Sequence, residues 1–357
     1  MSSRQQTGTA GVIGDEGRRR PMLARAAVAT LRHVGGQNLS LAIALGVLVT
    51  VIAIQRPNFF LPANLINIGV AVSLLGIVSL AQTVAIVSGG LDISLGPIVG
   101  LTSVVAAIGA LEGGAAGLLL GIAAGAACGL VNGLLIRYGR VNPIITTLAM
   151  YSALQGVTYI VANNRAIAVT SPLFNTIGTD KIAGIPIPLA ILIVMALLYF
   201  FVLGYTDIGR KIYAIGGNAN AARLAGIPVG RYIVGIYIWG GAAAGVAGVI
   251  LTARSGAGIA DSGAPDLALQ SITAVLLGGC SLSGGRGSVA GTILGVLLLG
   301  VLDNGLVLLN IPAFYQYVAG GLLLVVAVMI QEYRETAGGL IRNLRQRDQT
   351  SEPPVVP

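Results

Sequence analysis

The sequence predicts an all-α, polytopic membrane protein. Of its 357 residues, 55% are hydrophobic and only 10% are charged, and the mean hydropathy is +0.87. Soluble domains carry about 25% charged residues. The hydrophobic residues are also gathered into long runs, with the 52 glycines scattered inside them. A bundle of about ten transmembrane helices is the fold class that fits these observations.

Ten segments are predicted to cross the bilayer. A helix that spans about 30 Å of hydrocarbon needs about 20 mostly apolar residues. The first, third and eighth segments are short, and the eighth is also compatible with a half-helix or a re-entrant segment. In order, the predicted segments are 39–55, 65–87, 95–111, 115–136, 144–162, 187–205, 232–252, 267–282, 288–309 and 313–331.

The distribution of basic residues predicts that both termini are cytoplasmic. Cytoplasmic loops of membrane proteins are enriched in Lys and Arg. With the termini inside, 17 of the 21 Lys and Arg residues fall on cytoplasmic segments, and Arg56, Arg165, Lys181 and Arg254 fall outside. We therefore expect three parts: a basic cytoplasmic tail (1–38), of which 22–31 can lie on anionic lipid, a transmembrane domain (39–331) and a cytoplasmic C-terminal tail (332–357).

Several kinds of chemistry are not expected of this chain. The one histidine, His33, lies in the N-terminal tail, which argues against a histidine-rich metal site or a Ser-His-Asp triad. Neither lysine, Lys181 or Lys211, belongs to a Walker A loop. Cys128 and Cys280 fall in apolar runs and are interpreted as buried small residues. We expect no catalytic site, cofactor or metal in this chain, and no nucleic-acid partner.

Glycines recur every four residues in the predicted fourth span, at 117, 121, 125, 129 and 133. Such a stripe predicts a groove in which a neighbouring backbone packs closely. Shorter versions occur at Gly241 and Gly245 and at Gly291 and Gly295. A weak internal sequence repeat is also present, because "SGGLDIS" (88–94) is similar to "LGGCSLS" (277–283).

Two acidic residues lie inside the apolar sequence. A carboxylate at mid-bilayer costs about 2.5–3.5 kcal/mol, so it should be paired, hydrated or functional. Either Asp92 or Ser94 caps the third helix, or Asp92 lines a water-filled path at a Gly-Gly break. Asp303, next to Asn304, needs a packed partner such as Arg254 or a hydrated cavity. The candidate translocation path comprises Gln82, Ser88, Asp92, Ser94, Asp303 and Asn304, and Thr83, Asn132, Gln155 and Gln270 are further polar candidates.

The longest cytoplasmic loop, 206–231, contains the signals of a short helix. Asn218 is a good N-cap, "ANAARLA" favours helix, Gly226 suits the position after the helix, and Pro228 prevents its continuation. A short helix on this loop could dock a soluble partner. The residues predicted to form this docking helix are Asn218, Ala221, Ala222, Arg223, Leu224 and Gly226.

Four motifs carry a resemblance to a known family. "SGGLDISLG", "GRKIYAIGGNANAARLAGI", "LGGCSLSGGRGSVAGTILG" and "NGLVLL" resemble the ribose-type permeases of bacterial ABC monosaccharide importers, over roughly 56–331. The resemblance implies an ABC importer permease-type bundle in the inner membrane. It also implies a second permease copy, identical or paralogous, that encloses the path with this one.

The resemblance further implies two soluble partners. An extracytoplasmic sugar-binding protein would deliver a ribose-, xylose- or galactose-like sugar. A separate ABC ATPase, which binds ATP and Mg, would couple through 218–227. Family members often carry an acidic residue before the Ala-Ala of this helix, where this chain has Ala219 and Asn220. Related permeases carry branched-chain amino acids or signalling sugars.

Two alternatives use the acidic pair instead. An ion-coupled secondary transporter would titrate Asp92 and Asp303, and it would transport solute without an ATPase. An intramembrane aspartyl protease would need a Gly-x-Gly-Asp signature, and neither "SGGLD" nor "LGVLD" provides it.

Overall fold

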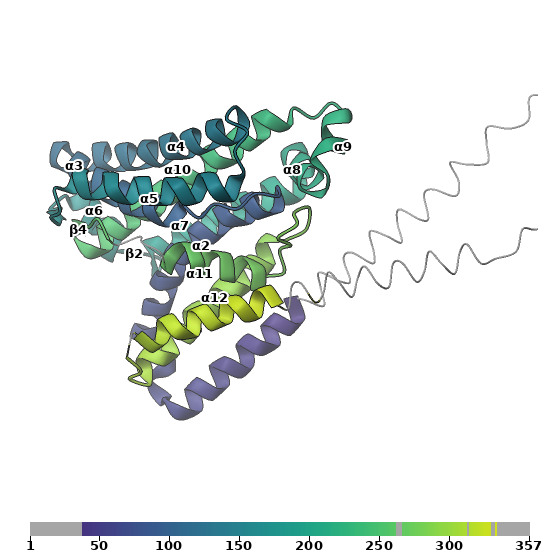
Figure 1. Ribbon diagram of the computed structural model, residues 1–357. Coiled ribbons are helices and arrows are strands. Elements are labelled where there is room, and N and C mark those ends of the chain that lie inside the picture. The colour runs from purple at the N-terminus through teal and green to yellow at the C-terminus, as the bar shows by residue number, and fades with distance from the viewer. Residues whose placement is uncertain (1–37, 262–265, 313, 330–332, 334–357) are drawn as a thin grey trace, which may run out of the picture.

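A computed structural model describes residues 38–261, 266–312, 314–329 and 333 (Figure 1). These residues are mostly helical, with four two-residue strands. Both predicted tails, apart from Asn38 and Tyr333, lie outside the described residues. The helices are Asn38–Gln55, η1 (Pro57–Phe60), α2 (Pro62–Val87), α3 (Leu95–Glu112), α4 (Gly114–Arg137), α5 (Pro143–Ala162), α6 (Pro172–Thr179), α7 (Ile187–Tyr205), α8 (Asp207–Gly217), α9 (Ala219–Leu224), α10 (Val229–Ser255), α11 (Asp266–Leu277), α12 (Val289–Leu308) and Phe314–Met329.

Each of the ten predicted segments contains a helix. Among the described residues, eight helices are long and apolar enough to cross a membrane. The other two, α11 and Phe314–Met329, are shorter. The 12 residues of α11 extend only about 18 Å, so this helix by itself does not cross the hydrocarbon. The half-helix interpretation of the eighth segment is therefore the correct one, and the full span 267–282 is wrong because the helix ends before Gly278.

Local sequence signals explain where several helices begin. Pro62 and Pro143 stand in the first turns of α2 and α5, where a missing N–H leaves no helical partner unsatisfied. The Asn142 side chain accepts a hydrogen bond from the Ile144 N–H at 2.9 Å, and Ser288 accepts one from the Gly291 N–H at 3.0 Å. These caps satisfy backbone donors that the helices leave unpaired.

The centre of the bundle is held together by helices that approach through glycine. α4 packs against both α3 and α10. A Cβ atom added at Gly129 would lie 2.7 Å from the Tyr237 carbonyl carbon, and one at Gly125 would lie 2.9 Å from the Gly245 nitrogen. The predicted groove on the fourth span is thus filled by the backbone of α10. α11 and α12 pack in the same way, because a Cβ at Gly291 would lie 3.0 Å from the Gly278 carbonyl carbon.

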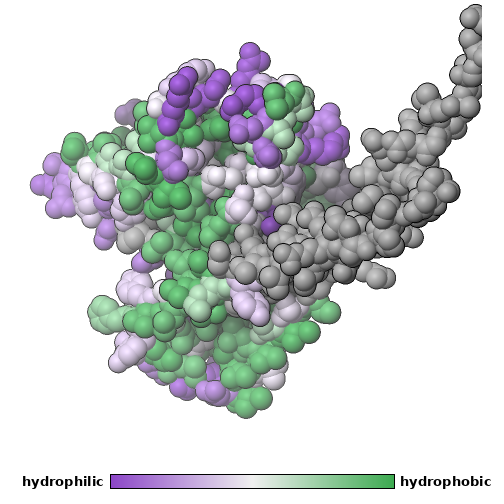
Figure 2. Space-filling model, turned by 45° about the vertical axis from the view of Figure 1, so that its right-hand side comes forward, coloured by the Kyte–Doolittle hydropathy of each residue, from purple (hydrophilic) through white to green (hydrophobic). Residues whose placement is uncertain are grey.

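The outer surface of the bundle is apolar. Large side chains such as Ile160, Leu119 and Val194 are 80%, 65% and 65% exposed. Hydrophobic groups cover much of the face seen in Figure 2, and hydrophilic groups gather towards its edges. A soluble monomer rarely exposes so much contiguous apolar surface. This is the exterior of a protein that contacts lipid.

The two ends of the bundle match the predicted topology. The segments predicted to be cytoplasmic meet at one end, where Gly230 lies against the Arg137 side chain and Gly216 lies against Val87. The segments predicted to be external meet at the other end. There β1 (Ile167–Ala168) pairs with β4 (Ala257–Gly258), and β2 (Lys181–Ile182) pairs with β3 (Ile185–Pro186).

Candidate functional site

The predicted docking helix is present as α9. The Asn218 side chain accepts hydrogen bonds from the N–H groups of Asn220 (3.0 Å) and Ala221 (2.9 Å). Gly226 has φ +82°, a conformation that ends the helix at little cost for glycine. The Ile227 N–H closes this end on the Ala222 carbonyl at 3.0 Å. The predicted cap and stop residues therefore act as expected.

One side of α9 is anchored and the other is free. Ala222 is 4% exposed and packs with Ile215 and Val229. Leu224 is 90% exposed, and Arg223 beside it is also exposed. Leu224 and Arg223 are therefore accessible for contact with another protein. We call the exposed side of α9 the docking surface.

The helix before α9, α8, connects the docking surface to the bundle. Its cap is Thr206, which accepts a hydrogen bond from the Gly209 N–H at 3.3 Å. Ile212 and Ile215 are buried, one turn apart, on its inner side. Sequence analysis did not predict α8, although the spacing of its isoleucines is typical of an amphipathic helix.

Where α8 ends, three segments meet at a backbone contact that we call the glycine junction, formed by Gly89, Gly216, Gly284 and Gly285. The Gly285 N–H donates to the carbonyl of Val87, the last residue of α2, at 2.8 Å. A Cβ at Gly284 would lie 2.9 Å from Gly89 Cα and 2.8 Å from the Gly216 carbonyl oxygen. The junction thus joins α8 to the end of α2 and to the loop before α12.

Tyr213 adds a side-chain bond to this junction. Its hydroxyl donates to the Gly287 carbonyl at 2.9 Å. Burial raises the pKa of Tyr213 to about 12, so the phenol stays protonated and remains a donor at neutral pH. This hydrogen bond links α8 directly to the loop that precedes α12.

Asp92 lies in a buried hydrogen-bond cluster near this end of the bundle. The carboxylate is 2% exposed. It accepts bonds from the Ser94 N–H (2.9 Å) and the Ser94 hydroxyl (2.6 Å), and the Ser94 oxygen accepts one from the Asn132 amide at 2.8 Å. Of the two interpretations, this geometry matches a cap for the start of α3, made by Asp92 and not by the Ser94 side chain.

The internal sequence repeat, 88–94 and 277–283, corresponds to a repeated local structure. α2 and α11 end in the same way: the N–H of Gly90 returns to the Ala85 carbonyl at 2.9 Å, and that of Cys280 returns to the Val275 carbonyl at 3.1 Å. Gly279 (φ +85°) therefore corresponds to Gly89 (φ +84°), so the structural repeat is shifted by one residue from the sequence match, and Ser281 does not take the place of Asp92.

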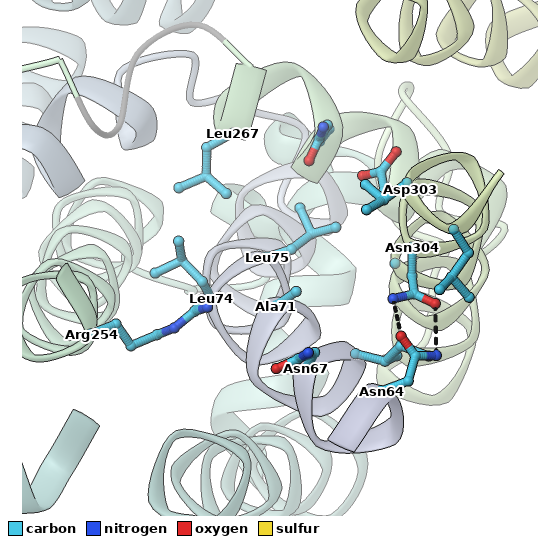
Figure 3. A pocket seen from close by; sticks show the side chains of 14 residues that line it. Asn64, Asn67, Ala71, Leu74, Leu75, Arg254, Leu267, Asp303 and Asn304 are labelled. Carbon is cyan, nitrogen blue, oxygen red and sulfur yellow. Dashed lines mark hydrogen bonds between the residues drawn. The ribbon is translucent and has the colours of Figure 1, made fainter. Parts of the chain in front are cut away.

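At the opposite, external end, four helices line a pocket of about 570 Å³. Its polar lining comes from α2, α10, α11 and α12, and its floor is aliphatic (Figure 3). A volume of this size is typical of sites for small molecules. The polar residues that line the pocket are Asn64, Asn67, Arg254, Gln270, Asp303 and Asn304.

An amide pair fixes one wall of the pocket. Asn64 of α2 donates to the Asn304 oxygen at 3.0 Å, and Asn304 of α12 donates back to the Asn64 oxygen at 2.8 Å. Asp303 and Arg254 lie on opposite sides of the pocket (Figure 3). Among the described residues no ion pair joins them, so Arg254 is not the packed partner of Asp303. A carboxylate at a cavity wall corresponds to the other interpretation, a hydrated site.

The predicted path residues therefore lie in three places. Asp303 and Asn304 line the pocket, together with Gln270. Asp92 and Ser94 lie in the cluster at the other end, and the Ser88 hydroxyl donates to the Ala85 carbonyl at 2.7 Å. Gln82 is fully buried in the inner part of α2, between the pocket and the end of the helix. Sequence analysis missed Asn64 and Asn67, which lie in the first turns of α2. In the described part of the chain, no group of three or more His, Cys, Asp or Glu residues is placed to hold a metal ion.

Comparison with known proteins decides the family. Residues 64–328 match the model of the branched-chain amino acid transport system / permease component family. The chain belongs to this permease family. It is 36% identical over 299 residues to the ribose import permease protein RbsC of Escherichia coli K12, which covers 82% of this chain and 93% of that protein.

Two further relatives agree with this assignment. RbsC of Bacillus subtilis is 38% identical over 82% of this chain and 92% of its own length. The L-arabinose ABC transporter permease protein AraH of Azospirillum brasilense is 36% identical over 81% of this chain and 85% of its own length. No solved structure matches the chain. Family membership and the apolar helices together identify a multi-pass membrane protein.

Proposed function

We propose that the chain is the permease subunit of an ABC importer that carries a monosaccharide across the cytoplasmic (inner) membrane. The observation that carries this proposal is the likeness, over more than four-fifths of the chain, to permeases named for ribose and arabinose. The polar pocket at the external end adds support, because amide groups can donate to and accept from sugar hydroxyls.

The proposed energy source is ATP, hydrolysed with Mg on a separate ATPase subunit. The exposed Leu224 and Arg223 of the docking surface would bind that subunit. Movement of α8 and α9 would then pass through the glycine junction to α2 and, by way of the preceding loop, to α12. Both α2 and α12 also line the pocket. Ala219 and Asn220 remove the acidic contact that related docking helices carry, so binding would rest on the apolar Leu224 and the cationic Arg223.

Two other partners belong to the proposal. An extracytoplasmic sugar-binding protein would deliver the solute to the pocket end. A second permease, identical or paralogous, would complete the transporter in the bilayer.

The second candidate, an ion-coupled carrier, is less well supported by the geometry. Such a carrier needs titrating groups that solute or water can reach. Asp303 lies at a cavity, but Asp92 is buried and already accepts two hydrogen bonds. The two carboxylates also lie towards opposite ends of the bundle and do not form one site.

Reconstitution into vesicles tests the proposal. The chain with its ATPase and binding protein should accumulate radiolabelled ribose or arabinose only when ATP is supplied on the cytoplasmic side. Uptake by the chain alone under a proton or sodium gradient would instead establish the carrier.

A matched pair of charge reversals tests the docking surface. Arg223→Glu should lower ATP-driven uptake by roughly tenfold or more and reduce co-purification of the ATPase, because it places a carboxylate at the interface. Lys181→Glu makes the same change at an exposed site on the external end and should have little effect. Equal uptake by both variants would remove α9 from the proposed interface.

A further inference from the structure

Gln82, in the inner part of α2, is a buried polar side chain without a partner. It is fully buried, and neither its amide oxygen nor its amide nitrogen has a hydrogen-bond partner among the described residues. The same is true of the Ser79 hydroxyl, one turn earlier. An unsatisfied buried group costs about 1–3 kcal/mol, and native structures hold few of them. Two side chains with unsatisfied polar groups on one face of a helix indicate a function other than packing.

The face of α2 that carries Gln82 is the face that lines the external pocket. Gln82 follows Asn64 by 18 residues, which is five turns of an α-helix, so the two side chains point in the same direction. Asn64, Ile68, Ala71 and Leu75 lie along this stripe and line the pocket. The stripe continues inward from the pocket to Ser79 and Gln82.

Other helices cover the remaining faces of α2. α7 covers the side with Gly76, whose added Cβ would lie 2.6 Å from Leu192. α10 covers the side with Ala81, which lies against Gly240. α12 packs on the same side as α7, farther along the helix, at Thr83, whose hydroxyl is 2.7 Å from that of Thr292. α11 also packs on α2, and its Leu267 and Gln270 line the pocket together with Ala71 and Leu75 of the stripe, so α11 faces the Gln82 stripe.

The short length of α11 explains why the stripe is open at one end and closed at the other. α11 begins at Asp266, and its first turns, with Leu267 and Gln270, form part of the pocket wall. Farther inward, its buried residues Ser271–Leu276 lie against the bundle. The same stripe of α2 is therefore a pocket wall above α11 and a buried surface beneath it.

α11 and α12 are built to move together. Their backbones approach closely at Gly278 and Gly291, and a Cβ at Gly295 would lie 3.0 Å from the Ala274 carbonyl carbon. The loop between them belongs to the glycine junction, which α8 also reaches. A shift of α8 that broke the Gly285–Val87 hydrogen bond would move the α11–α12 hairpin relative to the α2 stripe.

We propose that the external pocket is a solute-binding site of the permease itself, selective for a neutral polyhydroxylated molecule, and that Gln82 with Ser79 is the next binding position on the same path, uncovered when the α11–α12 hairpin moves. This inference rests on the proposed function. An amide offers two donors and an acceptor, and a hydroxyl offers both roles, so a sugar can bridge such groups in more than one orientation. Selection of the solute is then shared by the permease and does not reside in the binding protein alone.

Substitution of Gln82 tests the chemical part of the proposal. Gln82→Leu removes the unpartnered groups while keeping a similar volume, so the thermal midpoint of the purified chain should not fall. In the complete transporter, the apparent KM for ribose or arabinose should rise by up to roughly tenfold, the factor that one lost hydrogen bond supplies. Ala81→Val, on the α10 side, should leave KM unchanged. An unaltered KM in Gln82→Leu overturns the inference.

Thiol labelling tests whether position 82 becomes accessible when the α11–α12 hairpin moves. Gln82→Cys should react with a membrane-impermeant maleimide at least several-fold faster when the ATPase is trapped with vanadate, and added ribose or arabinose should slow that reaction. The unsubstituted chain, with Cys128 and Cys280 buried, and Ala81→Cys give the background rates. Labelling of Gln82→Cys at the Ala81→Cys rate in every state overturns the inference.

The two proposals fail differently. If the unsubstituted transporter accumulates neither sugar with ATP, the proposed function fails. If it accumulates one of them and Gln82→Leu does so with the same KM, the function stands and this inference fails.

Discussion

Replacement of Gly216 by alanine should damage the glycine junction. The added Cβ would lie 2.6 Å from the Gly285 nitrogen and closer still to the Val87 carbonyl oxygen, and both are backbone atoms that cannot rotate away. Overpacking of this kind costs about 1–3 kcal/mol. Loss of the Gly285–Val87 hydrogen bond adds about 0.5–1.5 kcal/mol. Alanine returns up to about 1 kcal/mol of helix propensity, so the net loss of unfolding free energy is about 0.5–4.5 kcal/mol.

The neighbouring glycine provides the control. A Cβ at Gly217 would meet no atom within 4 Å, so Gly217→Ala gains helix propensity without a clash. The propensity gain is common to both variants, so we expect them to differ by about 1.5–4.5 kcal/mol, with Gly217→Ala the more stable.

The assay is the thermal unfolding midpoint of each purified variant, measured in the same detergent, followed by ATP-driven uptake in vesicles. Gly216→Ala should unfold at a lower temperature and transport more slowly. If the two variants unfold at the same temperature and transport equally fast, the close backbone contact does not exist, and the argument that α8 drives α2 through it is wrong.

The remaining predictions concern two other contacts. Gly129→Ala should lower the unfolding midpoint, because its Cβ would lie 2.7 Å from the Tyr237 carbonyl carbon, whereas Gly156→Ala, with nothing within 4 Å, should not; similar midpoints would argue against the α4–α10 contact. Asp92→Asn should keep uptake because an amide oxygen still accepts from Ser94, and Asp92→Ala should cost about 1–3 kcal/mol by leaving Ser94 donors unpaired. Loss of uptake in a correctly inserted Asp92→Asn variant would instead show that the charge acts on the solute.

The transmembrane helices could be predicted from the sequence because lipid imposes both their length and their composition. Helix α7 matches its predicted range, and the predicted start of α5 differs from Pro143 by one residue. Helix α11 ends earlier than its predicted range, 267–282, for a local reason. The apolar run continues through 282, but Gly279 takes φ +85° and ends the helix at Leu277. Hydropathy does not detect that turn, and the likeness of this segment to 88–94 was interpreted only as a sign of repeated halves.

The cytoplasmic loop was predicted only in part. The cap and stop of α9 are local signals, carried by Asn218 and Gly226, and sequence reveals them directly. α8 depends on Ile212 and Ile215, whose burial requires knowledge of what lies beneath them. That surface comes from distant segments, the end of α2 and the loop after α11.

The pocket could not be assembled from the sequence. Asn64 and Asn304 form a reciprocal hydrogen-bonded pair although 240 residues separate them. Periodicity shows which residues share a face of one helix, but it does not show which helices are neighbours. For this reason Arg254 was correctly associated with the surroundings of Asp303 and wrongly considered as its direct partner.

The glycine groove of α4 has a consequence for the biogenesis of the protein. Its occupant, α10, begins roughly 90 residues after α4 ends, which corresponds to about 5–20 seconds of synthesis at cellular rates. During that interval α4 is already in the membrane with its groove unfilled, and acyl chains or an insertase must occupy the space. Ribosome pausing or truncation before α10 would therefore leave an incomplete half-bundle, which membrane quality-control proteases could recognise by that open groove.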